Sequence, residues 1–197
     1  MKLGYKNIGP EQADNAHGRY EKKLIVLHET VSPDYAGWAD INSVSQFLDN
    51  KDYGIHGITD LEGHIAWAYG FGDAVFWQCG GVNYESIGIE QVSRVMIDYK
   101  TNAARRAAWA LRDKELKATA KLCAAISNTR GIPLKAATWD HAHGQFAPGI
   151  LSHYQVSQHF SASQGHTDCW PVHLGGYYPL FEVIYLARGY KAMGYTL

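Results

Sequence analysis

The sequence predicts an α/β fold in which a central mixed β-sheet is flanked by helices. Short apolar runs typical of strands lie mainly in the first half of the 197-residue chain, and helical patterns are interleaved and follow later. No Pro/Gly/Ser-rich linker and no repeat divides these segments. Because a chain of this length can bury the core of one domain, we expect a single domain over residues 1–197, with its core over about residues 20–192.

The expected strands are marked by apolar and β-branched residues. Leu24 to His28 is a short run of this kind and predicts a buried strand. Residues 53–60 and 64–69 flank the turn Leu61-Glu62-Gly63, and the second segment alternates with period two, so we expect a hairpin. Further strands are expected at 74–79 and 86–92.

Loops and helices are expected between and after these strands. The segment from Val31 to Trp38 contains Pro33 and Gly37 and is expected to be a loop. A short helix is expected at 42–48, capped by Asn42 or Ser43. The strongest helical stretch covers 102–128, and the Arg130-Gly131-Ile132-Pro133 segment ends it. A last helix is expected at 178–192.

Charge and composition exclude several classes of partner. The formal net charge is −1, with clusters of mixed sign, so nucleic acid is not expected as a partner. No apolar run approaches the length that spans a bilayer, so membrane insertion is not expected. Aromatic residues make up 13% of the chain. They can line a carbohydrate-binding groove, although packing in the core is the first interpretation.

Three cysteines, Cys79, Cys123 and Cys169, are odd in number and widely spaced, which agrees with synthesis in a reducing cytoplasm. The start of the chain, Met1 to Asn7, has no apolar h-region, so no Sec-type signal peptide is expected.

Histidine is the residue type that points to chemistry, since the chain contains ten. His28, His153 and His166 lie beside other polar residues, and histidine is the commonest ligand of zinc. His28 and His153 are far apart in the sequence, however, so their spacing alone does not establish a metal site. Taken one at a time, each histidine is more typical of a satisfied polar residue than of a ligand.

Four segments of the chain form a recognisable series, namely Ile25 to Thr30, Tyr53 to Gly63, Asn83 to Glu90, and Ser152-His153 followed by Gly165 to Asp168. In this order they resemble the type-2 N-acetylmuramoyl-L-alanine amidases, which share their fold with peptidoglycan recognition proteins. The third segment is the most specific, because it resembles the family signature Asn-x-x-Ser-Ile-Gly-Ile-Glu in order and spacing. The resemblance runs from about Leu24 to Pro171.

The resemblance implies a catalytic zinc ion held by His28, His153 and Asp168. It also implies that His166 stabilises the developing oxyanion and that Glu90 orients or deprotonates the attacking water. The alternatives are that Glu90 is an ordinary surface or ion-pairing carboxylate and that His166 orients a ligand. His56 is left out of the metal set in favour of a groove-lining or structural role, and His141 and His143 are expected in a loop, with a place near the groove left open.

The chain departs from the family pattern at three places. Cys169 follows Asp168 where the family commonly has Pro, and this makes Cys169 a rival zinc ligand, although the register favours Asp168. Ile55 stands where some members have a tyrosine before the histidine, so a catalytic role for Tyr53 is open. The segment between His153 and His166 is longer than in the shortest members.

The resemblance therefore implies zinc-dependent hydrolysis of the amide bond between N-acetylmuramic acid and L-alanine in bacterial peptidoglycan. We expect a phage endolysin that stays in the host cytoplasm before its release to the cell wall, with association with the virion as the alternative location and a monomer as the favoured state. The alternatives are a non-catalytic peptidoglycan-recognition module, a cytoplasmic wall-recycling amidase and a different metallohydrolase of the stem peptide.

Overall fold

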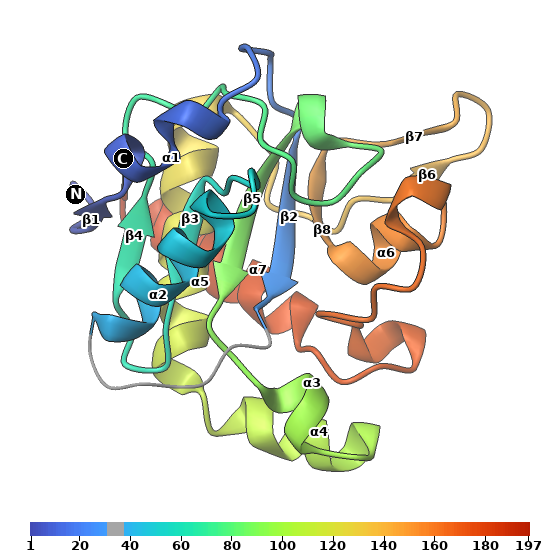
Figure 1. The fold of residues 1–197 in the computed structure, drawn as a ribbon. Helices are drawn as coiled ribbons and strands as arrows, with labels where there is room; N and C mark the ends of the chain where they lie inside the picture. The colour runs from blue at the N-terminus through green and yellow to red at the C-terminus, as the bar shows by residue number, and fades with distance from the viewer. Residues whose placement is uncertain (31–37) are drawn as a thin grey trace.

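The structure, a computed structural model, describes residues 1–30 and 38–197. Its main sheet has the strand order β1-β4-β3-β5-β2-β8 within these residues (Figure 1). The β3–β4 pair is antiparallel and the other neighbouring pairs are parallel, so the predicted mixed sheet is confirmed. The strands are β1 (Lys6–Asn7), β2 (Leu24–Glu29), β3 (Gly57–Thr59), β4 (Ile65–Trp67), β5 (Ser86–Gln91) and β8 (Gly149–Ser152).

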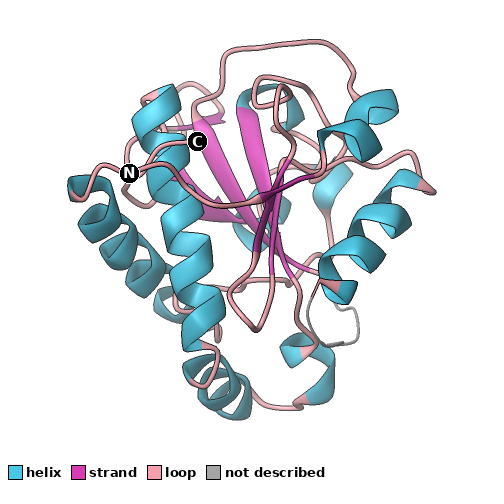
Figure 2. Cartoon of the chain, turned by 90° about the vertical axis from the view of Figure 1, so that its left-hand side faces the viewer, coloured by secondary structure: helices cyan, strands magenta, loops and turns pink. Residues whose placement is uncertain are grey.

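Helices cover both faces of this sheet (Figures 1 and 2). On one face α5 (Asp113–Arg130) and α7 (Leu180–Ala192) pack together, and on the other lie α2 (Ala39–Asp49) and the short α6 (His153–Ser157). The remaining elements are α1 (Gly9–Gln12), α3 (Val95–Asp98), α4 (Asn102–Ala110), the 3₁₀ turns η1 (Ala13–Asn15), η2 (Asn83–Glu85), η3 (Ser161–Ser163) and η4 (Val172–Leu174), and a small hairpin of β6 (Trp139–Asp140) and β7 (Gln145–Phe146). None of the helices described is long and apolar enough to cross a bilayer.

Side-chain alternation along β2 separates the two cores. Ile25 and Leu27 belong to the large cluster beneath α5 and α7, whereas Leu24 and Val26 belong to a cluster that includes Val156 of α6. Because successive side chains of a strand point to opposite faces, His28 shares the face of Leu24 and Val26. The end of β2 therefore presents His28 on the α6 side of the sheet.

The central strands and their register follow the sequence closely. The apolar runs predicted at 24–28 and 86–92 form β2 and β5, and the predicted hairpin forms β3 and β4 with shorter strands. The helix predicted at 178–192 is confirmed as α7, which begins at Leu180. Gly131 adopts a left-handed φ of 75° directly after α5, as a helix-ending glycine does.

Several expectations were wrong in detail. The stretch 102–128 forms two helices, because the chain turns at Leu111 and Arg112. Residues 74–79 form no regular strand; Ala74 makes only an isolated bridge with Arg19. The helix expected at 42–48 begins earlier, at Ala39, and Trp38 at its N-cap makes no side-chain capping bond, so neither Asn42 nor Ser43 is the cap. Of the loop expected at Val31 to Trp38, residues 31–37 lie outside the described residues.

Candidate metal centre

Two parallel strands bring His28 and His153 together at the same edge of the sheet. In the register of β2 and β8, Leu27 lies beside Ser152. The residue after Leu27 is His28, and the residue after Ser152 is His153. Ser152 then ends β8 and caps α6 through a capping box with Gln155. This local structure fixes His153 as the first residue of α6, beside the end of β2.

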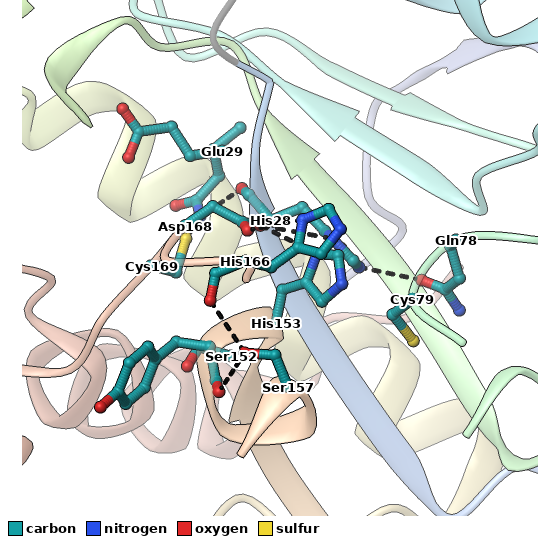
Figure 3. A network of polar contacts seen from close by, with 12 residues as sticks. His28, Glu29, Gln78, Cys79, Ser152, His153, Ser157, His166, Asp168 and Cys169 are labelled. Atoms are coloured by element: carbon teal, nitrogen blue, oxygen red, sulfur yellow. Dashed lines mark hydrogen bonds and ion pairs between the residues drawn. The ribbon is translucent and has the colours of Figure 1, made fainter. Parts of the chain in front are cut away.

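Asp168 completes a buried cluster with the two histidines (Figure 3). Nδ1 of His28 lies 3.1 Å from Nδ1 of His153. Oδ2 of Asp168 lies 3.2 Å from the His153 atom and 3.6 Å from the His28 atom. A tetrahedral zinc ion with bonds of about 2.0–2.2 Å separates its ligand atoms by about 3.3–3.6 Å. The donor atoms, 3.1, 3.2 and 3.6 Å apart, are therefore spaced close to this range, with two pairs slightly nearer than zinc ligands.

The outer hydrogen bonds of both rings leave these donor atoms free to bind a cation. Nε2 of His28 lies 3.1 Å from Oε1 of Gln78, and Nε2 of His153 lies 2.8 Å from Oγ of Ser163. When each ring donates its Nε2–H to that oxygen, both Nδ1 atoms carry lone pairs that face each other and the carboxylate of Asp168. Three facing acceptors need a positive charge between them, so the donor set fits a metal ion.

The pKa shifts of these three residues also favour a bound cation. Burial by itself lowers the pKa of His28, but the negative charges of Glu90 and Asp168 outweigh burial and raise it. Burial and a positive charge on His28 together lower the pKa of His153 to about 4, against the opposing effect of Asp168. Burial acts to raise the pKa of Asp168, yet hydrogen bonds from the histidines hold it well below the usual value. The carboxylate is therefore ionised, and the cluster resists a proton on His153.

Cys169, the rival ligand, points away from this cluster. Its backbone adopts a left-handed φ of 55°, and its Sγ accepts a hydrogen bond from Nε2 of Gln91 at 3.4 Å. Cys169 belongs to the large core cluster beneath α5 and α7, on the opposite side of the sheet from His28. The turn at Cys169 thus directs the Asp168 carboxylate to the histidines and the thiol into the core (Figure 3).

Glu90 lies on β5 directly beside His28 in the strand register. Its Oε2 is buried and has no hydrogen-bond partner among the described residues. Burial raises the pKa of Glu90 to about 7, against the opposing effect of His28. A carboxyl group of this kind can both accept and donate a proton near neutral pH.

His166 lies at the open side of the cluster. Its ring stacks on that of His153, with centroids 3.8 Å apart, and its Nδ1 lies 3.5 Å from Oδ1 of Asp168. Unlike the other members, the His166 side chain is about half exposed, at 53%. It can therefore reach a molecule bound next to the buried donors while Asp168 orients it.

A cleft of about 480 Å³ opens onto these residues. His28, His153, Asp168, Glu90 and His166 all line it, so the five residues predicted from the sequence meet in one place. The cleft is also lined by aromatic and apolar side chains, namely Phe47, Leu48, Tyr53, Trp77 and Met96. Tyr53 is about half exposed, at 52%.

His56 and the loop histidines lie outside the cluster. His56 is fully buried, accepts a hydrogen bond from the backbone N–H of Gly88, and donates to the carbonyl of Ala74, which is a structural role. His141 and His143 are exposed on the β6–β7 connection, where His143 pairs with Asp140.

Sequence reasoning missed Gln78 and Ser163, which contact the outer nitrogens of the two histidines. Neither belongs to a recognisable spacing, and a loop glutamine or serine is ordinary in a soluble protein. Ser163 comes from the long segment between His153 and His166, which folds as the end of α6 and η3. That segment therefore supplies a contact to the cluster.

Comparison with known proteins connects this geometry to a family. The family model described as N-acetylmuramoyl-L-alanine amidase matches residues 19–170. No curated protein sequence matches the chain significantly. Among solved structures, the hydrolase AmiA of Staphylococcus aureus is similar with a TM-score of 0.59 and 18% identity, covering 98% of this chain and 83% of that one.

Two further solved structures show the same fold. The N-acetylmuramoyl-L-alanine amidase LysC of Clostridium intestinale has a TM-score of 0.53 and 15% identity, with 93% of each chain covered. A mutant endolysin from Bacillus subtilis has a TM-score of 0.52 and 17% identity, covering 96% of this chain and 97% of that one.

Proposed function

The chain belongs to the N-acetylmuramoyl-L-alanine amidase family, and we propose that it cleaves the bond between N-acetylmuramic acid and L-alanine in peptidoglycan by means of a zinc ion. The observation that carries this proposal is the buried set of three donor atoms on His28, His153 and Asp168. Two neutral imidazoles and one carboxylate leave a bound zinc with a net positive charge and an open position.

When bound there, zinc supplies a Lewis acid that polarises an amide carbonyl and lowers the pKa of a coordinated water. The protein's own contribution begins with the cleft, which holds the substrate over the donor atoms. The buried surroundings strengthen every charge interaction at this point, because the local dielectric constant is low.

Glu90 is the residue that we assign to proton transfer. Glu90 lines the cleft beside the cluster, one of its oxygens is buried without a hydrogen-bond partner among the described residues, and burial raises its pKa to about 7. As a carboxylate it takes a proton from the attacking water, and as a carboxylic acid it returns a proton to the leaving amine of L-alanine. Both forms are accessible near neutral pH.

His166 is assigned to the carbonyl oxygen of the scissile amide. Its partly exposed ring stands beside the buried donors and is oriented by the Asp168 carboxylate. As negative charge develops on that oxygen, an N–H of His166 can donate a hydrogen bond to it and stabilise it.

The decisive experiment is digestion of purified peptidoglycan by the wild type and by His153→Ala, with mass spectrometry of the products. We expect the wild type to release stem peptides that begin at L-Ala, and the variant to release none. Activity of the variant equal to that of the wild type would remove His153 from the site. Products cut within the stem peptide would instead support a different metallohydrolase.

We also propose that this activity serves the lysis of a bacterial host during phage release, which the likeness in fold to an endolysin supports. In this setting, production of the chain inside a bacterium leaves the cells intact, and lysis follows once a holin opens the inner membrane. Lysis without the holin would contradict this role, and so would a failure of the cells to lyse when the holin is present.

A further inference from the structure

Gln78 connects the His28 ring with strand β5, and Figure 3 shows its contact with His28. Its Oε1 lies 3.1 Å from Nε2 of His28, and its Nε2 donates to Oγ of Ser86 at 3.0 Å. With the amide nitrogen directed to Ser86, the amide oxygen is the group that faces His28. An oxygen that only accepts holds the proton of His28 on Nε2 and leaves Nδ1 unprotonated.

The segment Asn83 to Glu90 is built to hold Gln78 in this position. Oδ1 of Asn83 accepts hydrogen bonds from the backbone N–H groups of Gln78 and Cys79. Gly88 lies between Ser86 and Glu90 on the same face of β5, and a Cβ at Gly88 would come within 1.6 Å of Oε1 of Gln78. The side chain of Gln78 therefore occupies the space that the missing Cβ of Gly88 leaves open.

Ser163 makes the corresponding contact to the second ring, through a hydroxyl that can accept a hydrogen bond from Nε2 or donate one to it. Its Oγ lies 2.8 Å from Nε2 of His153, and its side chain is buried. The two loops that carry Gln78 and Ser163 also pack against each other. A Cβ at Gly81 would enter the ring of Phe160, and one at Gly80 would lie 3.0 Å from the carbonyl oxygen of Ala162. The outer contacts of both histidines are thus parts of one packed unit.

We propose that Gln78 and Ser163 are positioning residues that orient His28 and His153 with both Nδ1 atoms directed at one point, and that Gln78 also fixes His28 in the Nε2–H tautomer. The proposal rests on the zinc site of the proposed function. Hydrogen bonds to the outer nitrogen of a histidine orient the ring and raise its basicity as a ligand. Asn83, Ser86 and Gly88 belong to the family signature. They act on the metal donors indirectly, by holding Gln78 in contact with His28.

The test measures zinc affinity by competition with a chelator, and tautomer by ¹⁵N NMR of the histidine rings in metal-free protein at about pH 9, where free imidazole is neutral. Gln78→Leu removes the acceptor, and Gln78→Glu keeps an oxygen at that place. Gln46→Leu, on the exposed surface of α2, is the matched control. Ser163→Ala repeats the test on His153.

We expect Gln78→Leu and Ser163→Ala each to weaken zinc binding by roughly 10- to 100-fold. We also expect Gln78→Leu to move the proton of His28 partly to Nδ1. Gln78→Glu should recover most of the affinity, and the Gln46 control should change neither readout. Should Gln78→Leu fail to fold, Gln78→Asn serves instead, because its shorter side chain withdraws the oxygen from His28.

Wild-type affinity together with an unchanged His28 tautomer in the Gln78 variant would overturn the inference and leave the proposed function standing. A wild type that binds no zinc would overturn the proposed function. The tautomer readout would still decide the part of Gln78, because it is made on metal-free protein.

Discussion

His28 and Glu90 are nearest neighbours across the parallel β2–β5 pair, at the same register position. Side chains at one register position of neighbouring strands point to the same face of the sheet, so the imidazole and the carboxyl group share one buried environment. Each alters the other: the charge of Glu90 raises the pKa of His28, and His28 acts to lower that of Glu90. Strand pairing therefore couples a candidate metal donor to the residue proposed for proton transfer.

Replacing Glu90 by Gln removes proton transfer and keeps the shape of the side chain. We expect amide cleavage to fall by roughly 10²- to 10⁴-fold, the range that general acid–base catalysis supplies. Zinc content should remain near one ion per chain, because Glu90 is outside the donor set. Cleavage rates on purified peptidoglycan check the loss of activity, and metal analysis of the same sample checks the zinc content. Full activity in the variant would show that Glu90 transfers no proton.

Asp168 and Cys169 are expected to respond in opposite ways when each is replaced. Asp168→Asn removes the anionic donor, so bound zinc should be lost on dialysis against a weak chelator. Cys169→Ala should retain zinc, because the thiol faces Gln91 in the core. The Cys169 variant is expected to lose some stability to heat, since a buried side chain is shortened. Zinc loss in that variant with an intact fold would restore Cys169 as a ligand.

His56 is expected to make the metal-free protein less stable in acid. Burial lowers the pKa of His56 to about 3, and both ring nitrogens are used by backbone groups. Between about pH 6.5 and pH 3 the unfolded chain binds a proton at this residue that the folded chain does not, so stability falls as the pH falls through this window. From pH 7 to pH 5 the loss from His56 is about 2 kcal/mol.

Urea unfolding at several pH values measures this effect, with His56→Gln as the comparison that cannot titrate. The dependence of unfolding free energy on pH should be shallower in that variant by about one proton near pH 5. Equal slopes in the two proteins would mean that His56 does not remain neutral in the folded state.

A buried ion pair at the start of α5 is expected to matter for stability. Nε of Arg112 lies 2.5 Å from Oε2 of Glu115, and both side chains are almost fully buried. Glu115→Ala leaves the guanidinium buried without this carboxylate, which costs about 3–5 kcal/mol. Urea unfolding near neutral pH gives the value. The surface pair of Asp113 with Lys117 is the control, and Asp113→Ala should change the unfolding free energy far less than Glu115→Ala does, because water screens an exposed pair.

How much of the site could be predicted depends on how far apart its members are in the sequence. The signature that ends in Glu90 is continuous, and β5 carries it in the predicted strand. His28 and His153 were identified through the resemblance alone, because their spacing carries no metal signature. No sequence pattern marked Gln78 and Ser163, since their importance comes from the histidine nitrogen that each contacts in the folded chain.

By itself, the sequence determined the apolar strands β2 and β5, the glycine that ends α5 and the family of the chain, because alternation, turn residues and a continuous motif are local properties. Only the tertiary structure decided that His28, His153 and Asp168 meet and that Cys169 turns away. These outcomes depend on strand register and on one left-handed residue. The physical reason is that a metal site needs donor atoms a few ångströms apart, and distant segments reach that spacing only through the packing of the whole sheet.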